Sequence, residues 1–238
     1  MSEKEKRITN VNIREAVDRI GILRSASPAS LAALLPFTVL RRFGKGEHLF
    51  HDRDIVSHVF FIADGIAALY KLNKDSEKKV MFVCGTGAML NEVILDGKAA
   101  SVECELLADT LVVSVQKDIF LNVCGEDFML ARAVMDSMSL KVRRLYHQMK
   151  NTPSSVRGDK RIAAKLCKLS REFGVPCERG TKINFDLTIT YLADMLGLKR
   201  GTVSRHLKLL ADGRLVIAGK NTFIIPDRGK LKRYCSEE

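Results

Sequence analysis

Between residues 200 and 208 the sequence places hydrogen-bond donors on one face of an expected helix. These donors are Arg200, Thr202, Ser204, Arg205 and Lys208. The opposite face is apolar and carries Val203, Leu207 and Leu210. Guanidinium, ammonium and hydroxyl groups can bind phosphate oxygens and the base edges of a major groove at the same time. The pattern therefore predicts contacts with double-stranded DNA, and a solvated basic helix face is the alternative.

A shorter helix is expected just before this one. Thr188 is suited to the N-cap because its hydroxyl can accept from the free amides of the first turn. Apolar residues then recur at helical spacing: Leu192, Met195 and Leu196. Gly197 follows, where a left-handed residue can end a helix, and the small Ala193 lets two helices cross closely. Residues 187–216 are thus predicted to form a helix-turn-helix. The predicted DNA contacts are Thr188, Lys199, Arg200, Gly201, Thr202, Ser204, Arg205 and Lys208.

The charge of the chain is concentrated in the same part. Residues 151–238 hold 18 Lys/Arg and 9 Asp/Glu, a net charge of +9, whereas residues 1–150 hold 21 and 19, a net charge of +2. This asymmetry is typical of a protein whose C-terminal domain binds DNA, although a merely solvated basic surface would produce it too.

Length and composition narrow the class of protein. The 238 residues suffice for two modest domains, and a hydrophobic fraction of 46% excludes a disordered chain. No apolar run approaches 18 residues and the N-terminus lacks the apolar core of a signal peptide, so we expect a cytoplasmic protein without a membrane partner. The six cysteines show no short paired spacing, which argues against a disulfide framework or a zinc finger. No catalytic constellation is present, so neither catalytic residues nor metal ligands are predicted.

Residues 37–115 change to short apolar segments separated by turn residues, which predicts a sandwich or barrel. The expected strands are 38–42, 48–50, 58–63, 67–72, 79–84, 101–107 and 111–115. Helices are expected before them over residues 12–23 and from Ser27-Pro28 onward, since a cap followed by proline favours a helix start. A short helix over residues 118–124 is expected after the strands.

A long helix from residue 126 carries an apolar stripe. Its members are Val134, Met138, Val142, Leu145 and Met149, at spacings of 4, 4, 3 and 4. This period is that of a coiled-coil seam and predicts a homodimer, while a helix packed only on its own domain is the alternative. Residues 151–158 are the expected hinge, and a further amphipathic helix is predicted over 159–173, ended by Gly174 and Pro176. Residues 215–217 and 222–225 are expected to form a wing hairpin.

The run Arg200-Gly201-Thr202-Val203-Ser204-Arg205 resembles the recognition helix of the CRP/FNR family of bacterial regulators, and the resemblance extends over roughly residues 20–226. It implies an α+β protein with an N-terminal cyclic-nucleotide-binding-type β jelly roll (1–125), a long dimerisation helix with its hinge (126–152) and a C-terminal winged helix-turn-helix (153–238). It also implies a palindromic operator, a small-molecule effector and, for an activator, contact with RNA polymerase. Gly201 stands where the family has glutamate.

Residues 87–101 resemble the phosphate-binding cassette of that family. Glu92 and Ser101 match the cassette, whereas Ala100 stands where the phosphate arginine belongs and Asn91 replaces a glycine. The effector pocket is predicted from Leu90, Asn91, Glu92, Val93, Ala100 and Ser101. A buried phosphodiester needs a bidentate cation, so we expect the cassette geometry to survive and the effector not to be cyclic AMP or cyclic GMP.

Other sensing chemistries stay open to different degrees. The iron-sulfur branch of the family has a cysteine cluster near its N-terminus, and this chain has no cysteine before Cys84, so that cofactor is not expected. Three alternatives remain: thiol redox sensing, a cyclic-nucleotide-dependent regulator, and a haem sensor. The haem would be bound by one or two histidines of the set His48, His51, His58 and His147. A cyclic-nucleotide-binding subunit without a DNA role would not need a winged helix of net charge +9.

Overall fold

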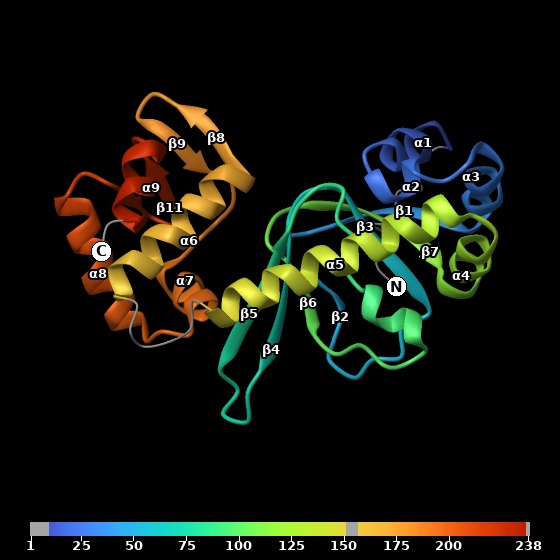
Figure 1. Ribbon diagram of the computed structural model, residues 1–238, viewed down its shortest axis with the longest axis horizontal. Helices are drawn as coiled ribbons and strands as arrows, with labels where there is room; N and C mark the ends of the chain where they lie inside the picture. The colour runs from blue at the N-terminus through green and yellow to red at the C-terminus, as the bar shows by residue number, and fades with distance from the viewer. Residues whose placement is uncertain (1–9, 151–156, 237–238) are drawn as a thin grey trace. The chain divides into compact units, whose positions relative to one another are not determined.

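The computed structural model describes residues 10–150 and 157–236 (Figure 1). The chain divides into two compact units, of which the first comprises residues 1–71 and 81–144 and the second residues 72–80 and 145–238. Most of the hinge predicted at residues 151–158 lies outside the described residues. In the part of the chain described, no helix combines the length and apolar character needed to cross a membrane.

The first unit is built on two antiparallel sheets. One sheet has the order β1–β7–β3, and the other has the order β2–β6–β4–β5. Their strands are β1 (Thr38–Phe43), β2 (His48–Phe50), β3 (His58–Asp64), β4 (Ala67–Leu72), β5 (Lys78–Cys84), β6 (Glu103–Leu106) and β7 (Thr110–Gln116). Buried side chains such as Phe50, Leu69 and Cys104 fill one apolar core of this roll. The predicted β roll is therefore confirmed, with each expected strand within about two residues of its observed bounds.

Helices cover the other core of this unit. They are α1 (Asn10–Asp18), α2 (Gly21–Arg24), α3 (Pro28–Leu34), the 3₁₀ turns η1 (Leu35–Phe37) and η2 (Glu92–Asp96), α4 (Lys117–Glu126) and α5 (Phe128–Lys150). The single helix expected over residues 12–23 is wrong, because Ile20 is extended (φ −101°, ψ 102°) and fully buried between α1 and α2. Ser27 caps α3 as predicted, accepting from the amide of Ser30 at 3.1 Å.

The start of α5 lies at Phe128 and not at residue 126. The carboxylate of Asp127 accepts from the amides of Met129 (3.0 Å) and Leu130 (3.2 Å) and so satisfies two free donors of the first turn. Its second oxygen accepts from the amide of Ser27 at 2.7 Å, which joins the starts of α3 and α5. Hydrogen bonds from the Ser27 amide, the Ser30 hydroxyl and the Leu130 amide hold the pKa of Asp127 well below its usual range.

The second unit is a winged helix-turn-helix. It contains α6 (Gly158–Phe173), β8 (Gly174–Cys177), β9 (Gly180–Ile183), α7 (Ile189–Leu196), α8 (Arg200–Asp212), β10 (Ile217–Gly219), β11 (Thr222–Ile225) and α9 (Arg228–Ser236), with a sheet of order β10–β11–β9–β8. The elements β8, β9 and α9 were not predicted from the sequence. Gly174 and Pro176 do end α6, but they also open an edge strand, where a proline leaves no ladder partner unsatisfied.

Candidate nucleic-acid interface and effector site

The predicted helix-turn-helix is formed by α7 and α8. The hydroxyl of Thr188 accepts from the amide of Tyr191 at 3.0 Å and caps α7. Gly197 adopts the left-handed conformation (φ +61°), and the amide of Leu198 then donates to the carbonyl of Ala193 at 3.1 Å. This C-cap turns the chain within two residues, so that α8 begins at Arg200.

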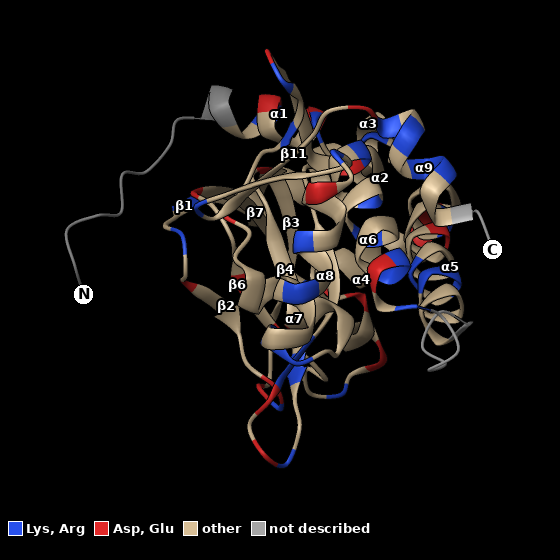
Figure 2. Cartoon of the chain, turned by 90° about the vertical axis from the view of Figure 1, so that its left-hand side faces the viewer, with Lys and Arg blue, Asp and Glu red and all other residues tan. Residues whose placement is uncertain are grey.

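The two faces of α8 differ as the sequence predicts. Val203, Leu207 and Leu210 are buried in the core of the second unit. The predicted contact residues Lys199, Arg200, Gly201, Ser204, Arg205 and Lys208 are exposed, while Thr202 and Thr188 are half-buried. Figure 2 colours the Lys and Arg residues blue along the ribbon, α8 among the helices that carry them. Thr188 has a structural task as well, because its oxygen already accepts the capping hydrogen bond.

Gly201 has room for a side chain. A Cβ atom added to it would meet no atom of the described residues within 4 Å, and its backbone is helical without positive φ. The glycine is thus not required by packing, and a side chain at this exposed position would extend into solvent.

Hydrogen bonds join α6 to α7 and to α9. The guanidinium of Arg161 donates to the carbonyl of Leu196, the last residue of α7, at 2.7 Å. The buried carboxylate of Asp159 accepts from Tyr234 on α9 and from Arg157 (3.0 and 3.2 Å). Burial alone would raise the pKa of Asp159, but these donors lower it overall, and the hydrogen bond to Asp159 raises the pKa of Tyr234 to about 12.

The wing is a tight hairpin between β10 and β11. Asn221 adopts φ +57° at its turn, a conformation that asparagine tolerates better than most residues, and its carbonyl accepts from the amide of Leu187 at 3.0 Å. Lys220 is exposed beside it. This basic wing residue was not among the predicted DNA contacts, although its position between two short strands was a signal for it.

The predicted effector residues differ in burial and in their contacts. Asn91 is buried, and its side chain accepts from the amide of Phe60 and donates to the carbonyl of His58, both at 2.9 Å. It therefore fixes the cassette to β3. Leu90 and Ala100 are buried in the roll, whereas Val93 and Ser101 are exposed.

Glu92 is bound by the long helix α5. Only 2% of its side chain is exposed, Ser137 donates to one carboxylate oxygen at 2.6 Å, and the ammonium of Lys141 forms an ion pair with the other. The same ammonium donates to the carbonyl of Met89 at 3.0 Å and lies 6.0 Å from the ring centroid of Phe82. The carboxylate expected to face an effector is thus neutralised from within the chain. No sequence pattern predicts this role of Lys141, because Glu92 lies 49 residues away in the chain.

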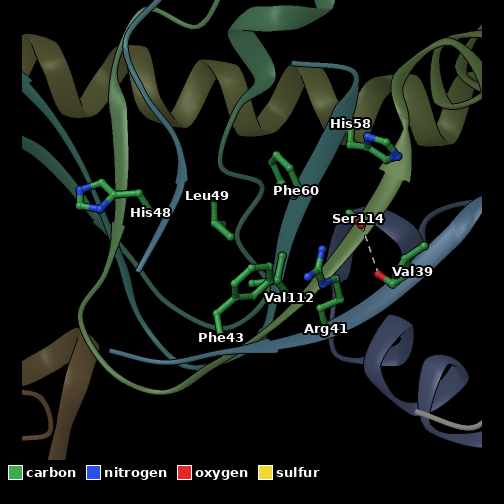
Figure 3. Close-up of a pocket in the computed structure, with 9 residues that line it drawn as sticks. All are labelled: Val39, Arg41, Phe43, His48, Leu49, His58, Phe60, Val112 and Ser114. Atoms are coloured by element: carbon green, nitrogen blue, oxygen red, sulfur yellow. Dashed lines mark hydrogen bonds between the residues drawn. The ribbon is translucent and has the colours of Figure 1, made fainter. Parts of the chain in front are cut away.

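A cavity of about 290 Å³ lies elsewhere in the roll, between β1, β2, β3 and β7 (Figure 3). Its wall is mostly apolar, with one cation and two histidines. It is lined by Val39, Arg41, Phe43, His48, Leu49, His58, Phe60, Val112 and Ser114, none of which belongs to the predicted pocket.

The predicted dimer stripe is divided by the roll. Val134 is 5% exposed and belongs to the roll core, and Met138 packs against the same core. Leu145 is half-buried, and Val142 and Met149 are exposed. Large apolar side chains instead remain exposed at every seventh residue of α5: Phe128 (69%), Met135 (50%), Val142 (43%) and Met149 (72%). Because Val134 already packs in the roll core, the seam, which stays a prediction, is placed at Met135 instead.

Three of the six cysteines, Cys104, Cys124 and Cys235, are poor candidates for redox sensing. All six are free thiols. Burial raises the pKa of the Cys104 thiol far above its usual range and those of Cys124 and Cys235 to about 11. A thiol with a raised pKa holds little of the reactive thiolate at neutral pH.

Comparisons with known proteins agree with this architecture. Residues 160–234 match the Crp-like helix-turn-helix domain and residues 40–127 match the cyclic nucleotide-binding domain. The chain is 22% identical over 222 residues to the CRP-like cAMP-activated global transcriptional regulator of Mycobacterium tuberculosis, covering 92% of this chain and 98% of that protein. It is 23% identical over 214 residues to the nitrogen fixation regulation protein FixK of Azorhizobium caulinodans, covering 89% and 84%. The solved structure of the c-di-GMP responsive global regulator CLP of Xanthomonas campestris has a TM-score of 0.73 at 17% identity, covering 84% and 100%.

Proposed function

Because this chain belongs to the CRP/FNR family of DNA-binding transcription regulators, we propose that it binds a palindromic operator as a homodimer and answers to a signal other than a cyclic nucleotide. The observation that carries the DNA part is the exposed face of α8. Arg200 and Arg205 project from a helix whose other face is anchored in the core, within a segment of net charge +9. Arginine is the side chain that most often reads guanine, by a bidentate contact to its O6 and N7 atoms.

Gly201 sets the specificity of this reading. A glutamate at this position could accept from the amino group of cytosine, and glycine cannot. Discrimination at that base pair should therefore be weaker by roughly 1–3 kcal/mol. The proposed half-site is related to the family's TTGA or GTGA type but is relaxed or altered at that position.

A binding selection on randomised DNA tests this proposal, run at one fixed salt concentration because salt alone changes such affinities by orders of magnitude. Gly201→Glu should shift the selected site toward the usual family operator, and Arg205→Ala should weaken binding to all sequences, most of all to the selected site. Leu209→Glu is the matched control, since it adds the same charge at an exposed position of the same helix, outside the predicted contacts. Identical selected sites from wild type and Gly201→Glu would refute the assigned register of α8.

The homodimer is proposed on the seam of α5 that contains Met135. Exposed apolar side chains at residues 128, 135, 142 and 149 repeat with the heptad period of a two-stranded coiled coil. Pairing of two such helices would bury side chains that are otherwise in water. Two recognition helices related by a two-fold axis would then enter major grooves about 34 Å apart.

The signal does not follow from family membership. One relative named above is cAMP-activated, and another is c-di-GMP responsive. In this chain the cassette has a buried methyl group at Ala100 where an arginine would bind phosphate, and Glu92 is already paired with Lys141. The separate cavity, with Phe43, Phe60 and one arginine in its wall, suits a small, partly apolar ligand.

Titration calorimetry with cyclic AMP and with cyclic GMP tests this part directly. We expect no heat of binding at micromolar concentrations of either nucleotide. Saturable micromolar binding of one of them would contradict the proposal and would mean that a cation other than an arginine at position 100 binds the phosphate.

A further inference from the structure

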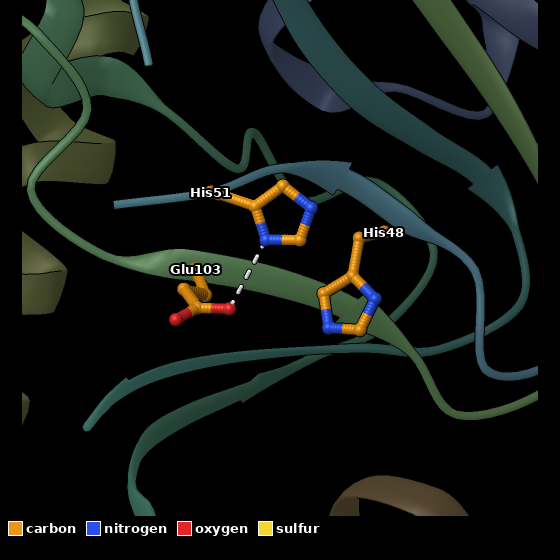
Figure 4. A group of neighbouring side chains, drawn as sticks. All are labelled: His48, His51 and Glu103. Atoms are coloured by element: carbon orange, nitrogen blue, oxygen red, sulfur yellow. Dashed lines mark hydrogen bonds and ion pairs between the residues drawn. The ribbon is translucent and has the colours of Figure 1, made fainter. Parts of the chain in front are cut away.

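Two histidines and a carboxylate meet on the sheet β2–β6–β4–β5 of the roll (Figure 4). One ligand atom from each of His48, His51 and Glu103 lies within 4.8 Å of the other two. The two imidazole rings stack with centroids 4.9 Å apart, and Nδ1 of His51 is 3.2 Å from Oε2 of Glu103. The His51 side chain is 59% exposed, so the cluster is open to ions from solvent.

The backbone is irregular where this cluster requires it. In a regular strand, residues three apart point to opposite faces, so His48 and His51 would diverge. Here the pairing of β2 with β6 shifts register between His48 and Phe50. The chain then turns after Phe50, with the amide of His51 donating to the carboxylate of Asp54 at 2.7 Å and Arg53 held at φ +71°. A positive φ is costly for arginine, so this turn, which directs His51 toward Glu103, is held against local strain.

Tyr70 on β4 helps to orient the carboxylate of Glu103. Its hydroxyl donates to Oε2 of Glu103 at 2.8 Å and lies 3.0 Å from Nε2 of His48. Groups that bind metals through carboxylate oxygens are commonly fixed by such a hydrogen bond from a residue behind them.

We propose that His48, His51 and Glu103 bind a divalent transition-metal ion such as Zn²⁺, leaving a further coordination position open. Imidazole nitrogens and one carboxylate oxygen are a donor set that such ions prefer. Bonds of about 2.0–2.2 Å in a tetrahedral site place the ligand atoms roughly 3.3 Å apart. The pair His51–Glu103 already has this spacing, and rotation of the His48 ring away from the Tyr70 hydroxyl completes the set.

The site would join two segments next to the cassette. The amide of Arg53 donates to the carbonyl of Ala100 at 2.8 Å, and the amide of Ala100 donates to the carbonyl of Asp54 at 2.9 Å. A metal bridge from His51 to Glu103 would fasten the same turn to the strand that leaves the cassette. The proposal does not depend on DNA binding and is tested without DNA.

The test is titration of the full-length protein with Zn²⁺ by calorimetry and with Co²⁺ by visible absorption, in a Cys177→Ser background that removes the exposed thiol. We expect one ion per chain and a Co²⁺ spectrum of low coordination number. His51→Ala and Glu103→Gln should each weaken binding at least tenfold. Tyr70→Phe should weaken it by about 10–100-fold, as expected for a group that orients a ligand.

His147→Ala is the matched control, because it removes an exposed histidine on α5 outside the cluster. Thermal melts without metal check that each variant is folded. If Glu103→Gln does not fold, His51→Ala alone decides the test, since the His51 side chain is exposed and its loss should leave the fold intact. No binding of either ion by the wild-type background, or equal binding by wild type and His51→Ala, would overturn the proposal. In that case the cluster is only a hydrogen-bonded network.

Discussion

The ion pair between Glu92 and Lys141 allows a quantitative prediction of how its loss changes the stability of the roll. The carboxylate is 2% exposed and the ammonium 20% exposed. Truncating Lys141 to methionine keeps most of the apolar stem but leaves a buried charge whose one remaining side-chain donor among the described residues is the Ser137 hydroxyl. Removing one partner of a buried pair typically costs about 3–5 kcal/mol, whereas replacing both partners by neutral groups is often nearly neutral.

The expected stabilities of the single and double variants follow from this difference between removing one partner and replacing both. Lys141→Met should lower the stability of the roll by about 3–5 kcal/mol. Glu92→Gln should cost less, roughly 1–3 kcal/mol, because the partly exposed ammonium keeps the carbonyl of Met89 as an acceptor. The double variant Glu92→Gln/Lys141→Met should be more stable than Lys141→Met alone. A domain of this size shifts its Tm by about 2–4 °C per kcal/mol, so the Lys141→Met shift should be on the order of 10 °C.

Scanning calorimetry of the full chain measures these shifts. Arg143→Met is the control, since it removes an exposed cation from the same helix and should leave the transition in place. The transition of the roll is identified as the one that Tyr234→Phe does not move, because Tyr234 belongs to the second unit. A Lys141→Met shift no larger than that of Arg143→Met, or a double variant less stable than both single variants, would refute the assignment of a buried, mutually dependent pair.

Three further changes test other contacts. Asp127→Asn should destabilise the chain at neutral pH, because the pKa of Asp127 is depressed in the folded state. The difference in Tm between wild type and variant should be present above the unfolded pKa of about 4 and should shrink as the pH falls below it. Measurement of Tm against pH tests this. Tyr234→Phe should cost the second unit about 1.5–3 kcal/mol by removing a donor from the buried Asp159 carboxylate, and an unchanged Tm for that unit would contradict this. Met135→Glu with Val142→Glu should convert the dimer to monomers in analytical ultracentrifugation, and a double variant that still sediments as a dimer would show that the seam is misplaced.

The features that the sequence predicted have local causes. The Ser27 and Thr188 caps and the Gly197 turn depend on hydrogen bonds or backbone angles within four residues. The strands of the roll were recognisable because each is short, apolar and bounded by turn residues. Such signals need no knowledge of the partner segments.

The features that it missed depend on distant partners. Lys141 and Glu92 are 49 residues apart, and His51 and Glu103 are 52 apart. Neither pairing has a spacing signal, because only the folded roll brings the segments together. The burial of Val134 was missed for a different reason. Val134 and Met135 are both apolar and lie only about 100° apart around the helix, so the pattern alone cannot assign one to the roll and the other to solvent.

Two features of the cassette, Ala100 and the pairing of Glu92 with Lys141, both disfavour a cyclic nucleotide. The absence of an arginine at position 100 removes the cation for a phosphate, and Lys141 supplies a cation to the one carboxylate that remains. A ribose hydroxyl approaching Glu92 would have to displace that ammonium from the carboxylate, from the carbonyl of Met89 and from the face of Phe82. It would replace a charged donor by a neutral one in a buried site, and charge-assisted hydrogen bonds are about twice as strong as neutral ones. A cyclic nucleotide would therefore lack favourable contacts at its ribose as well as at its phosphate. A signal that acts on this roll has to leave the Glu92–Lys141 ion pair intact or has to begin by breaking it.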